Sequence, residues 1–237
     1  MNSYKAQGII IRRDNLGEAD RLVSLFTNRF GKIKVIAKGA RRPRSRMASS
    51  TDLFCEIEFV AARTRSIDIL TESKILSSHC DIGSQLSKTK NAYWVGELIN
   101  RLTHDEEPNP KLYQLLSEVL KIINHQKTNL IVDYFIYHCL SLLGYKPELG
   151  SCAKTGKKLS CTDKLYFSPA AGGVICLPDT KAIKVNPDTI KALRYLAHSW
   201  DDVKKLRLPS DIAHEVHHCL KDFAEYVTEK EIKSDKL

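Results

Sequence analysis

The hydrophobic pattern of the chain changes near residue 75. Before that point, short apolar runs alternate with polar residues and are bounded by turn-forming ones, at 6–13, 22–26, 32–38, 53–60 and 66–70. Runs of this kind are typical of half-buried strands. Five of them in close succession predict a small β-barrel or sandwich. In the third run, Ile33 and Val35 fall on one face and Lys32 and Lys34 on the other, which predicts a cationic outer face.

After residue 75, apolar residues recur with the period of a helix, at 88–103, 111–124, 129–143, 187–199 and 209–228. The third segment is apolar nearly all round and predicts a central, buried helix. Between the third and fourth segments, residues 146–180 are polar and rich in Gly, Lys and Cys. They predict a small inserted module, with Gly172 and Gly173 in a hairpin turn.

The expected architecture is an α+β protein with more than one domain. Residues 1–80 form a five-stranded OB-fold β-barrel, the commonest small five-stranded barrel that binds nucleic acid. Residues 81–237 form an α-helical domain, which is interrupted at residues 146–180 by a degenerate, zinc-knuckle-like module.

Composition narrows the classes of protein to consider. The chain has 237 residues, of which 43% are hydrophobic and 27% charged, as in ordinary globular proteins. No apolar run is long enough to span a membrane, and the start of the chain does not have the pattern of a signal peptide. We therefore expect a cytoplasmic, nucleoid-associated protein whose seven cysteines are thiols or metal ligands.

The net charge of +9 comes from one segment. Residues 21–51 contain nine Lys or Arg and no Asp or Glu, and the other 28 basic and 28 acidic residues balance. Such a patch predicts a polyanionic partner, such as nucleic acid, an anionic membrane surface or an acidic protein tail. A solubilising surface is the alternative, although solubilising charge is usually mixed in sign. Seven cations lie within fifteen residues: Lys32, Lys34, Lys38, Arg41, Arg42, Arg44 and Arg46.

These cations predict contact with the phosphate backbone, with little sequence preference and a steep dependence on salt. Binders of single strands usually add aromatic side chains on which bases stack. The candidates for stacking here are few: Tyr4, Phe26, Phe30, Phe54 and Phe59.

A short enzyme motif occurs near the end of the chain. His214, Glu215 and His218 match the H-E-x-x-H pattern of zinc hydrolases. Helix phase places both histidines opposite the apolar face, towards water, and no third ligand is evident. We expect surface histidines, with a zinc hydrolase as the alternative. No nucleophile elbow, P-loop or dinucleotide motif is present, so we expect no enzymatic activity.

Two long stretches of the chain resemble the RecO family of bacterial recombination mediators. They are GIIIRRDNLGEADRLVSLFTNRFGKIKVIAKGARRPRSR, residues 8–46, and the YKPELGSC and YFSPAAGGVIC segments within residues 145–176. The resemblance implies an OB-fold, a helical domain and, in many members, a zinc knuckle. It also implies binding of single- and double-stranded DNA and annealing of complementary strands.

The resemblance further implies three protein partners. With RecR, such a protein helps to load RecA onto strands coated by single-strand-binding protein, whose acidic C-terminal tail it binds. We expect the tail to bind the helical domain. Carried over residue by residue, the resemblance assigns DNA contact to Arg12, Lys32, Lys34, Lys38, Arg41, Arg42, Arg44 and Arg46. A plain nucleic-acid-binding module without a mediator role is the alternative.

The inserted module keeps half of each knuckle. In zinc-bearing relatives the module resembles two C-x-x-C pairs separated by about twenty residues. Here Thr155 replaces the second cysteine of the first pair, and Asp179 replaces that of the second. Cys152, Cys161, Cys176 and Asp179 could make a three-sulfur, one-oxygen zinc site, since zinc accepts carboxylate oxygen. A metal-free module closed by its own packing is the alternative that we favour, so no cofactor is expected.

Overall fold

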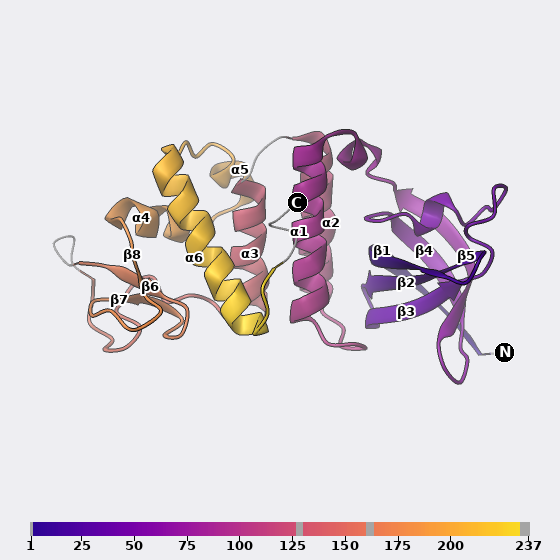
Figure 1. Cartoon of the computed structure of the whole chain (residues 1–237), viewed down its shortest axis with the longest axis horizontal. Helices are drawn as coiled ribbons and strands as arrows, with labels where there is room; N and C mark the ends of the chain where they lie inside the picture. Colours follow the sequence, from indigo (N-terminus) through magenta and orange to yellow (C-terminus); the bar gives the residue numbers. More distant parts are fainter. Residues whose placement is uncertain (1, 127–129, 160–163, 233–237) are drawn as a thin grey trace. The chain divides into compact units, whose positions relative to one another are not determined.

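The computed structural model describes residues 2–126, 130–159 and 164–232 (Figure 1). The chain falls into two compact units, and the division lies at residue 127. None of the helices in the described ranges is long and apolar enough to cross a membrane.

The first unit begins with a closed barrel of five strands. They are β1 (Ser3–Leu16), β2 (Asp20–Thr27), β3 (Gly31–Ala37), β4 (Glu56–Ala62) and β5 (Asp68–Ser77). The strand order is β1-β2-β3-β5-β4, and every pairing is antiparallel except that of β3 with β5. The predicted OB-fold barrel is confirmed.

One long strand is shared by both halves of the barrel. The first half of β1 pairs with β4 and the second half with β2, with a shift of register between Ile10 and Arg12. Inward side chains fill the barrel, as their alternation predicts. The core contains Ala6, Ile10, Val23, Leu25, Val35, Ala37, Cys55, Ile57, Phe59, Ala61 and Leu70.

Two helices complete the first unit, α1 (Leu86–Leu102) and α2 (Pro110–His125), after the short turns η1 (Ser49–Thr51) and η2 (Cys80–Ser84). Gly96 lets α1 approach the barrel closely, because a Cβ atom there would lie 3.0 Å from the Phe54 ring. Helix α2 is tied to β4 by the buried carboxylate of Glu56. That carboxylate accepts hydrogen bonds of 2.9 Å from Tyr113 and from Ser117.

The second unit contains α3 (Leu130–Leu142), α4 (Pro187–Tyr195), α5 (Trp200–Val203) and α6 (Ser210–Thr228). As predicted, α3 is buried along most of its length. The helix predicted over 187–199 is shorter in the structure, because α4 ends at Tyr195, and α5 begins beyond the predicted range, at Trp200. A small sheet, β7-β6-β8, is formed by β6 (Tyr166–Ser168), β7 (Gly173–Ile175) and β8 (Ile183–Lys184).

The hairpin predicted at Gly172 and Gly173 is confirmed, since β6 and β7 pair antiparallel across it. The change from barrel to helices also comes where the sequence places it, at η2. The compact first unit nevertheless extends through α2. Compactness and independent folding are different properties, so the domain boundaries at residues 80, 146 and 180 stay a prediction.

Candidate nucleic-acid interface

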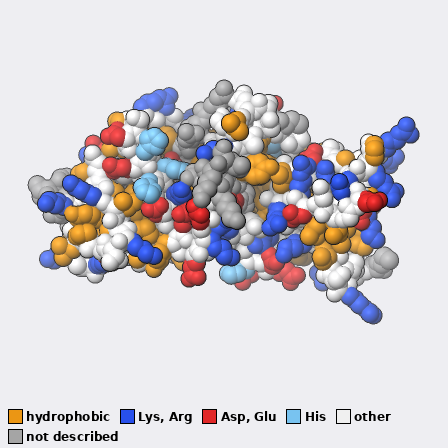
Figure 2. Space-filling view, in the orientation of Figure 1, with side chains coloured by type: hydrophobic (Ala, Val, Ile, Leu, Met, Phe, Trp, Pro, Cys, Tyr) orange, Lys and Arg blue, Asp and Glu red, His pale blue; other side chains and the backbone are white. Residues whose placement is uncertain are grey.

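Lys and Arg side chains gather over the barrel on the face shown in Figure 2. Most of the predicted DNA-contact residues have exposed side chains. Those with exposed side chains are Arg12, Lys34, Lys38, Arg41, Arg42, Arg44 and Arg46. Five of them, from Lys38 onward, belong to the loop between β3 and β4. We call residues 38–47 the basic loop.

The basic loop carries four open cations. Lys38, Arg42, Arg44 and Arg46 have neither an ion pair nor a hydrogen bond from their side chains to other described residues. An exposed cation with no internal partner keeps its charge available for an anion. This part of the basic segment therefore has the property that a phosphate-binding surface needs.

The start of the basic loop is held by the turn between β1 and β2. Asp20 Oδ1 accepts a 2.7 Å hydrogen bond from the Gly39 amide, and the amide of Arg41 donates to Ala19 O at 2.9 Å. The Arg41 guanidinium donates to Gly17 O at 2.8 Å. Gly39 has a φ of +67°, a conformation that favours glycine. Arg41 is thus partly a structural residue, although its side chain is exposed.

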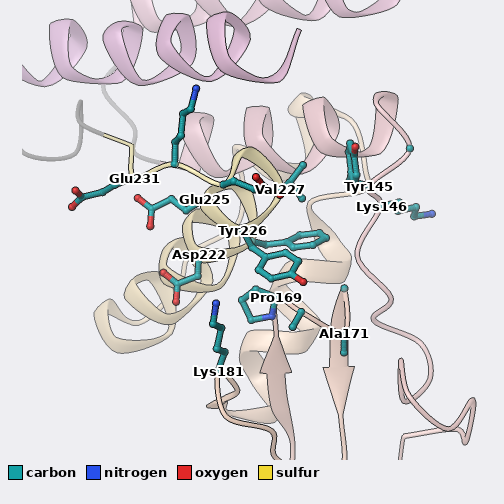
Figure 3. A pocket seen from close by; sticks show the side chains of 16 residues that line it. Tyr145, Lys146, Pro169, Ala171, Lys181, Asp222, Glu225, Tyr226, Val227 and Glu231 are labelled. Atoms are coloured by element: carbon teal, nitrogen blue, oxygen red, sulfur yellow. The ribbon is translucent and has the colours of Figure 1, made fainter. Parts of the chain in front are cut away.

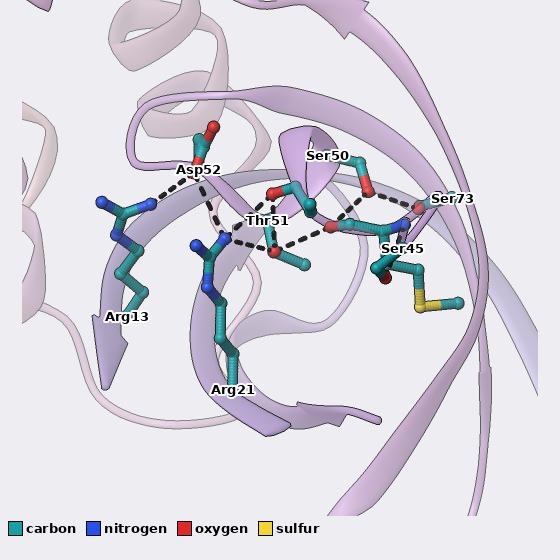
Figure 4. A network of polar contacts seen from close by, with 9 residues as sticks. Arg13, Arg21, Ser45, Ser50, Thr51, Asp52 and Ser73 are labelled. Carbon is teal, nitrogen blue, oxygen red and sulfur yellow. Dashed lines mark hydrogen bonds and ion pairs between the residues drawn. The ribbon is translucent and has the colours of Figure 1, made fainter. Parts of the chain in front are cut away.

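The far end of the loop is held by two arginines of the barrel (Figure 4). Arg21 donates hydrogen bonds of 2.9 Å to Ala48 O and to Thr51 Oγ1, and both Arg21 and Arg13 pair with Asp52. Arg21 counted among the nine cations of the basic segment, but Asp52 neutralises it. Contacts that fix both ends limit the conformations open to the loop between them.

Lys32 is a correction to the sequence prediction of an outward-facing cation. Its side chain is buried, and its ammonium donates to Asn100 O and Thr103 O, both at 2.8 Å. These carbonyls end α1, where a cation is favoured. Asp105 lies 3.4 Å from the same ammonium. The alternation of β3 places Lys32 on the outer face, but residues 103–107 cover Lys32 there. We therefore leave Lys32 out of the interface.

Arg12 and Lys34 are exposed but have acidic neighbours. Arg12 Nε lies 2.9 Å from Asp14 on the same strand, and Lys34 Nζ lies 3.7 Å from Asp105. Exposed pairs of this kind contribute little to stability and exchange readily with other ions. Both residues therefore stay in the predicted interface.

Only two of the candidate stacking aromatics are accessible. Phe26, Phe54 and Phe59 are buried, whereas Tyr4 and Phe30 are partly exposed. The Tyr4 and Phe30 rings pack edge to face with centroids 4.8 Å apart, and they line a groove of about 660 Å³. Burial, with Asp68 beside the hydroxyl, raises the pKa of Tyr4, which keeps the hydroxyl protonated.

Two further arginines at this groove are absent from the sequence prediction. Arg63 lies over the Tyr4 ring, 5.4 Å from its centroid, and Arg29 lies 6.0 Å from the Phe30 centroid. Arg63 comes from the β4–β5 turn, outside the basic segment. Arg29 comes from the β2–β3 turn and is one of the nine cations of that segment, but it lies outside the run of seven from Lys32 to Arg46. The groove lies at one end of β3, and the basic loop follows the other end.

The H-E-x-x-H segment has a structural explanation. Glu215 Oε2 accepts from the Asn186 amide at 2.9 Å and from Thr189 Oγ1 at 2.7 Å, which caps the start of α4. His214 and His218 are exposed, as predicted, and His218 Nδ1 lies 3.1 Å from Asp222. The carboxylate that would be a general base is therefore committed to a helix cap.

The described members of the predicted zinc-ligand set form no metal site. Among the described residues, no group of three His, Cys, Asp or Glu side chains could hold a metal ion. Cys161 lies outside the described residues. Asp179 is hydrogen-bonded to Ser168, Lys154 and Lys181, and neither Cys152 nor Cys176 is in a disulfide with another described residue. The described residues of this set thus do not fit a zinc ion, and the zinc-knuckle character of the module is not confirmed.

Cys152 is nonetheless in an unusual environment for a thiol. A hydrogen bond from the Thr155 hydroxyl and further ones from the amides of Cys176, Lys154 and Thr155 lower its pKa to about 6. The sulfur is therefore largely a thiolate at neutral pH. Cys139 and Cys219 differ from Cys152, because burial raises the pKa of both thiols.

A large hollow lies in the second unit, between the end of α6 and the small sheet (Figure 3). Its volume is about 1010 Å³, and Tyr145, Pro169 and Tyr226 form apolar parts of its wall. Four acidic residues line it against three lysines: Asp222, Glu225, Glu229 and Glu231 against Lys146, Lys181 and Lys230. This balance of charge does not favour a phosphate backbone, so the barrel remains the candidate interface.

Comparison with known proteins assigns both parts of the chain. Residues 1–79 match the family model described as recombination protein O N terminal, and residues 84–236 match recombination protein O C terminal. A DNA repair protein RecO of Dehalococcoides mccartyi is 35% identical over 98% of this chain and 94% of its own length.

Two other relatives are similar to the chain at comparable identity. A DNA repair protein RecO of Acetivibrio thermocellus is 33% identical over 84% of this chain and 81% of its own length. One of a Roseiflexus species is 32% identical over 98% of this chain and 83% of its own length. The barrel, its basic loop and the helical region thus occur together in a chain that belongs to the recombination protein O (RecO) family of DNA repair proteins.

Proposed function

We propose that this protein is a recombination mediator that binds single- and double-stranded DNA and anneals complementary strands. The observation that carries the proposal is the basic loop, where Lys38, Arg42, Arg44 and Arg46 are open cations. Each cation that meets a phosphate releases condensed counterions, which favours binding at low salt. The basic loop makes contact with the phosphates, and Lys34 and Arg12 extend the surface over the barrel.

Annealing follows from charge without any bond being broken. Two single strands repel each other because both are polyanions, and a cationic surface that holds both lowers this repulsion. The surface must also release the duplex that forms. Contacts through the phosphate backbone permit release because they depend on charge alone and are weakened by competing salt ions. In this proposal the protein is not an enzyme and needs no cofactor.

The mediator role rests on the family and on partners that it implies. We propose that the protein acts with RecR and that it binds the acidic C-terminal tail of single-strand-binding protein. In this role it helps RecA to load onto coated strands. The tail would bind the helical region, which leaves the basic loop free for DNA.

Annealing of complementary strands coated by their single-strand-binding protein tests the proposal. We expect this protein to accelerate annealing, and the acceleration to fade as salt concentration rises. The triple variant Arg42→Glu, Arg44→Glu, Arg46→Glu should abolish the acceleration and reduce the slope of log affinity against log salt by at least about 2. Its far-ultraviolet circular dichroism should stay unchanged, because these three side chains make no hydrogen bond or ion pair with other described residues.

A matched control separates position from total charge. The variant Lys111→Glu, Lys157→Glu, Lys158→Glu changes the net charge equally at exposed sites outside the basic loop, and it should anneal at the wild-type rate. DNA binding without acceleration would leave a plain nucleic-acid-binding module and refute the mediator role. Equal loss in both triple variants would refute the assignment to the basic loop.

A further inference from the structure

The two half-knuckles of the module lie together in the structure. The amides of Thr155 and Gly156 donate to Cys152 O, at 3.2 and 2.8 Å, and close a tight turn after Cys152. The Ala153 amide, next to Cys152, donates a 2.7 Å hydrogen bond to Val174 O, two residues before Cys176. The first half-knuckle, which contains Cys152, is therefore in hydrogen-bond contact with the second, which contains Cys176.

Asp179, at the second position of the second half-knuckle, is bonded on both carboxylate oxygens. Oδ2 lies 3.0 Å from Lys154 Nζ and accepts a 2.7 Å hydrogen bond from Ser168, and Oδ1 accepts from the Lys181 amide at 3.1 Å. Lys154 stands two residues after Cys152, so its pair with Asp179 joins the two half-knuckles directly.

A zinc ion and the Lys154 ammonium would compete for one carboxylate. Zinc binds carboxylate oxygen at about 2.0–2.2 Å, and a structural site needs four ligands. Thr155, whose hydroxyl lies beside the Cys152 sulfur, is a poor ligand. With Asp179 paired to Lys154, the module lacks a ligand in each half-knuckle.

We infer that the module is held closed by the Lys154–Asp179 ion pair, with Ser168 as its support, in the place where a metal would join the two half-knuckles. The inference includes its converse. Thiolates placed at residues 155 and 179 should complete a four-cysteine zinc site with Cys152 and Cys176. It does not depend on the proposed function, because no DNA contact enters the argument.

Metal analysis and cobalt spectroscopy test both parts. Wild-type protein purified from zinc-supplemented medium should hold little zinc, and its melting temperature should not change when chelator is added. The variant Thr155→Cys, Asp179→Cys should bind one zinc ion. With cobalt it should show the thiolate charge-transfer band of tetrahedral sulfur ligation. The variant Thr155→Cys alone, which keeps the ion pair, should show no such site.

The substitution Cys161→Ser, made in the wild type and in the double-cysteine variant, controls for zinc binding by Cys161. One zinc ion in the wild type, lost in Cys152→Ser or in Cys161→Ser, would overturn the inference. A folded double-cysteine variant that binds no metal would overturn its converse.

The ion pair itself is tested in the wild-type background. Lys154→Met should increase hydrogen exchange at the Cys176 amide several-fold, because the two half-knuckles then separate more easily. Lys157→Met, an exposed lysine of the same turn, should leave that rate unchanged. Equal exchange rates in the two variants would show that the ion pair does not hold the module closed.

Discussion

Replacement of Lys32 by Met separates a structural lysine from its DNA-binding neighbours. The buried ammonium donates to two carbonyls at the end of α1, and each hydrogen bond to a charged group contributes about 1.5–3 kcal/mol. Removal of the charge also removes the desolvation cost of burying it, which offsets part of this loss of stability. We expect Lys32→Met to lower the free energy of unfolding of the first unit by about 2–3 kcal/mol.

Lys34→Met is the matched control, two residues away on the same strand. Its side chain is half exposed and its ion pair with Asp105 is 3.7 Å long, so its contribution should be below about 1 kcal/mol. It should instead reduce the slope of log affinity for DNA against log salt by about 1, as the loss of one phosphate contact requires.

Urea unfolding followed by Trp94 fluorescence measures the stability of the first unit. The measurement needs a Trp200→Phe background, because Trp200 lies in the second unit and would add its own transition. At about 2 kcal/mol per molar urea, Lys32→Met should lower the midpoint by about 1 M. An unchanged midpoint, together with a loss of DNA affinity as large as that of Lys34→Met, would refute the structural role of Lys32.

Three further predictions concern polar side chains with internal hydrogen-bond partners. Tyr113→Phe removes a hydrogen-bond donor to the Glu56 carboxylate and should lower the free energy of unfolding of the first unit by about 1–3 kcal/mol. Measured by urea unfolding in a Glu56→Gln background, the loss caused by Tyr113→Phe should be smaller. Burial lowers the pKa of His138 in the folded protein. Below about pH 6.5 the unfolded chain therefore binds more protons at this residue than the folded protein does. The stability that neutral His138 contributes is lost as pH falls through the lowered pKa. The difference in unfolding free energy between wild type and His138→Gln should shrink from about pH 7.5 to 5, and a constant difference would contradict this. Glu215→Ala should destabilise α4 by about 1 kcal/mol, seen as faster hydrogen exchange there, whereas a change in metal content instead would contradict the capping role.

Local patterns in the sequence predict the barrel and the long helices well. Alternation in the strands and the 3.6-residue period depend on neighbours along the chain, so β3, α2 and α6 fall close to their predicted ranges. β5 extends to Ser77, beyond the predicted end at residue 70, because pairing with β4 supports residues that have no apolar alternation of their own. Secondary structure that depends on a distant partner leaves little local signal.

The same distinction applies to the candidate interface. The sequence shows where cations cluster, and the basic loop lies there. It cannot show that residues 103–107 cover Lys32 or that Asp52 neutralises Arg21, because these contacts join residues far apart in the chain. The groove beside Tyr4 is assembled from separate turns and strands, so the sequence could not show that Arg29 and Arg63 meet there.

The seam between β3 and β5 is the shortest in the barrel. Only Val35 with Asp68 and Ile36 with Ile69 are in register there, whereas β1 and β2 share eight pairs. A seam this short opens at lower free energy than its neighbours. When it opens, two strand edges become available for an added strand from another chain. The barrel is thus least firmly closed beside the end of β3 that leads into the basic loop.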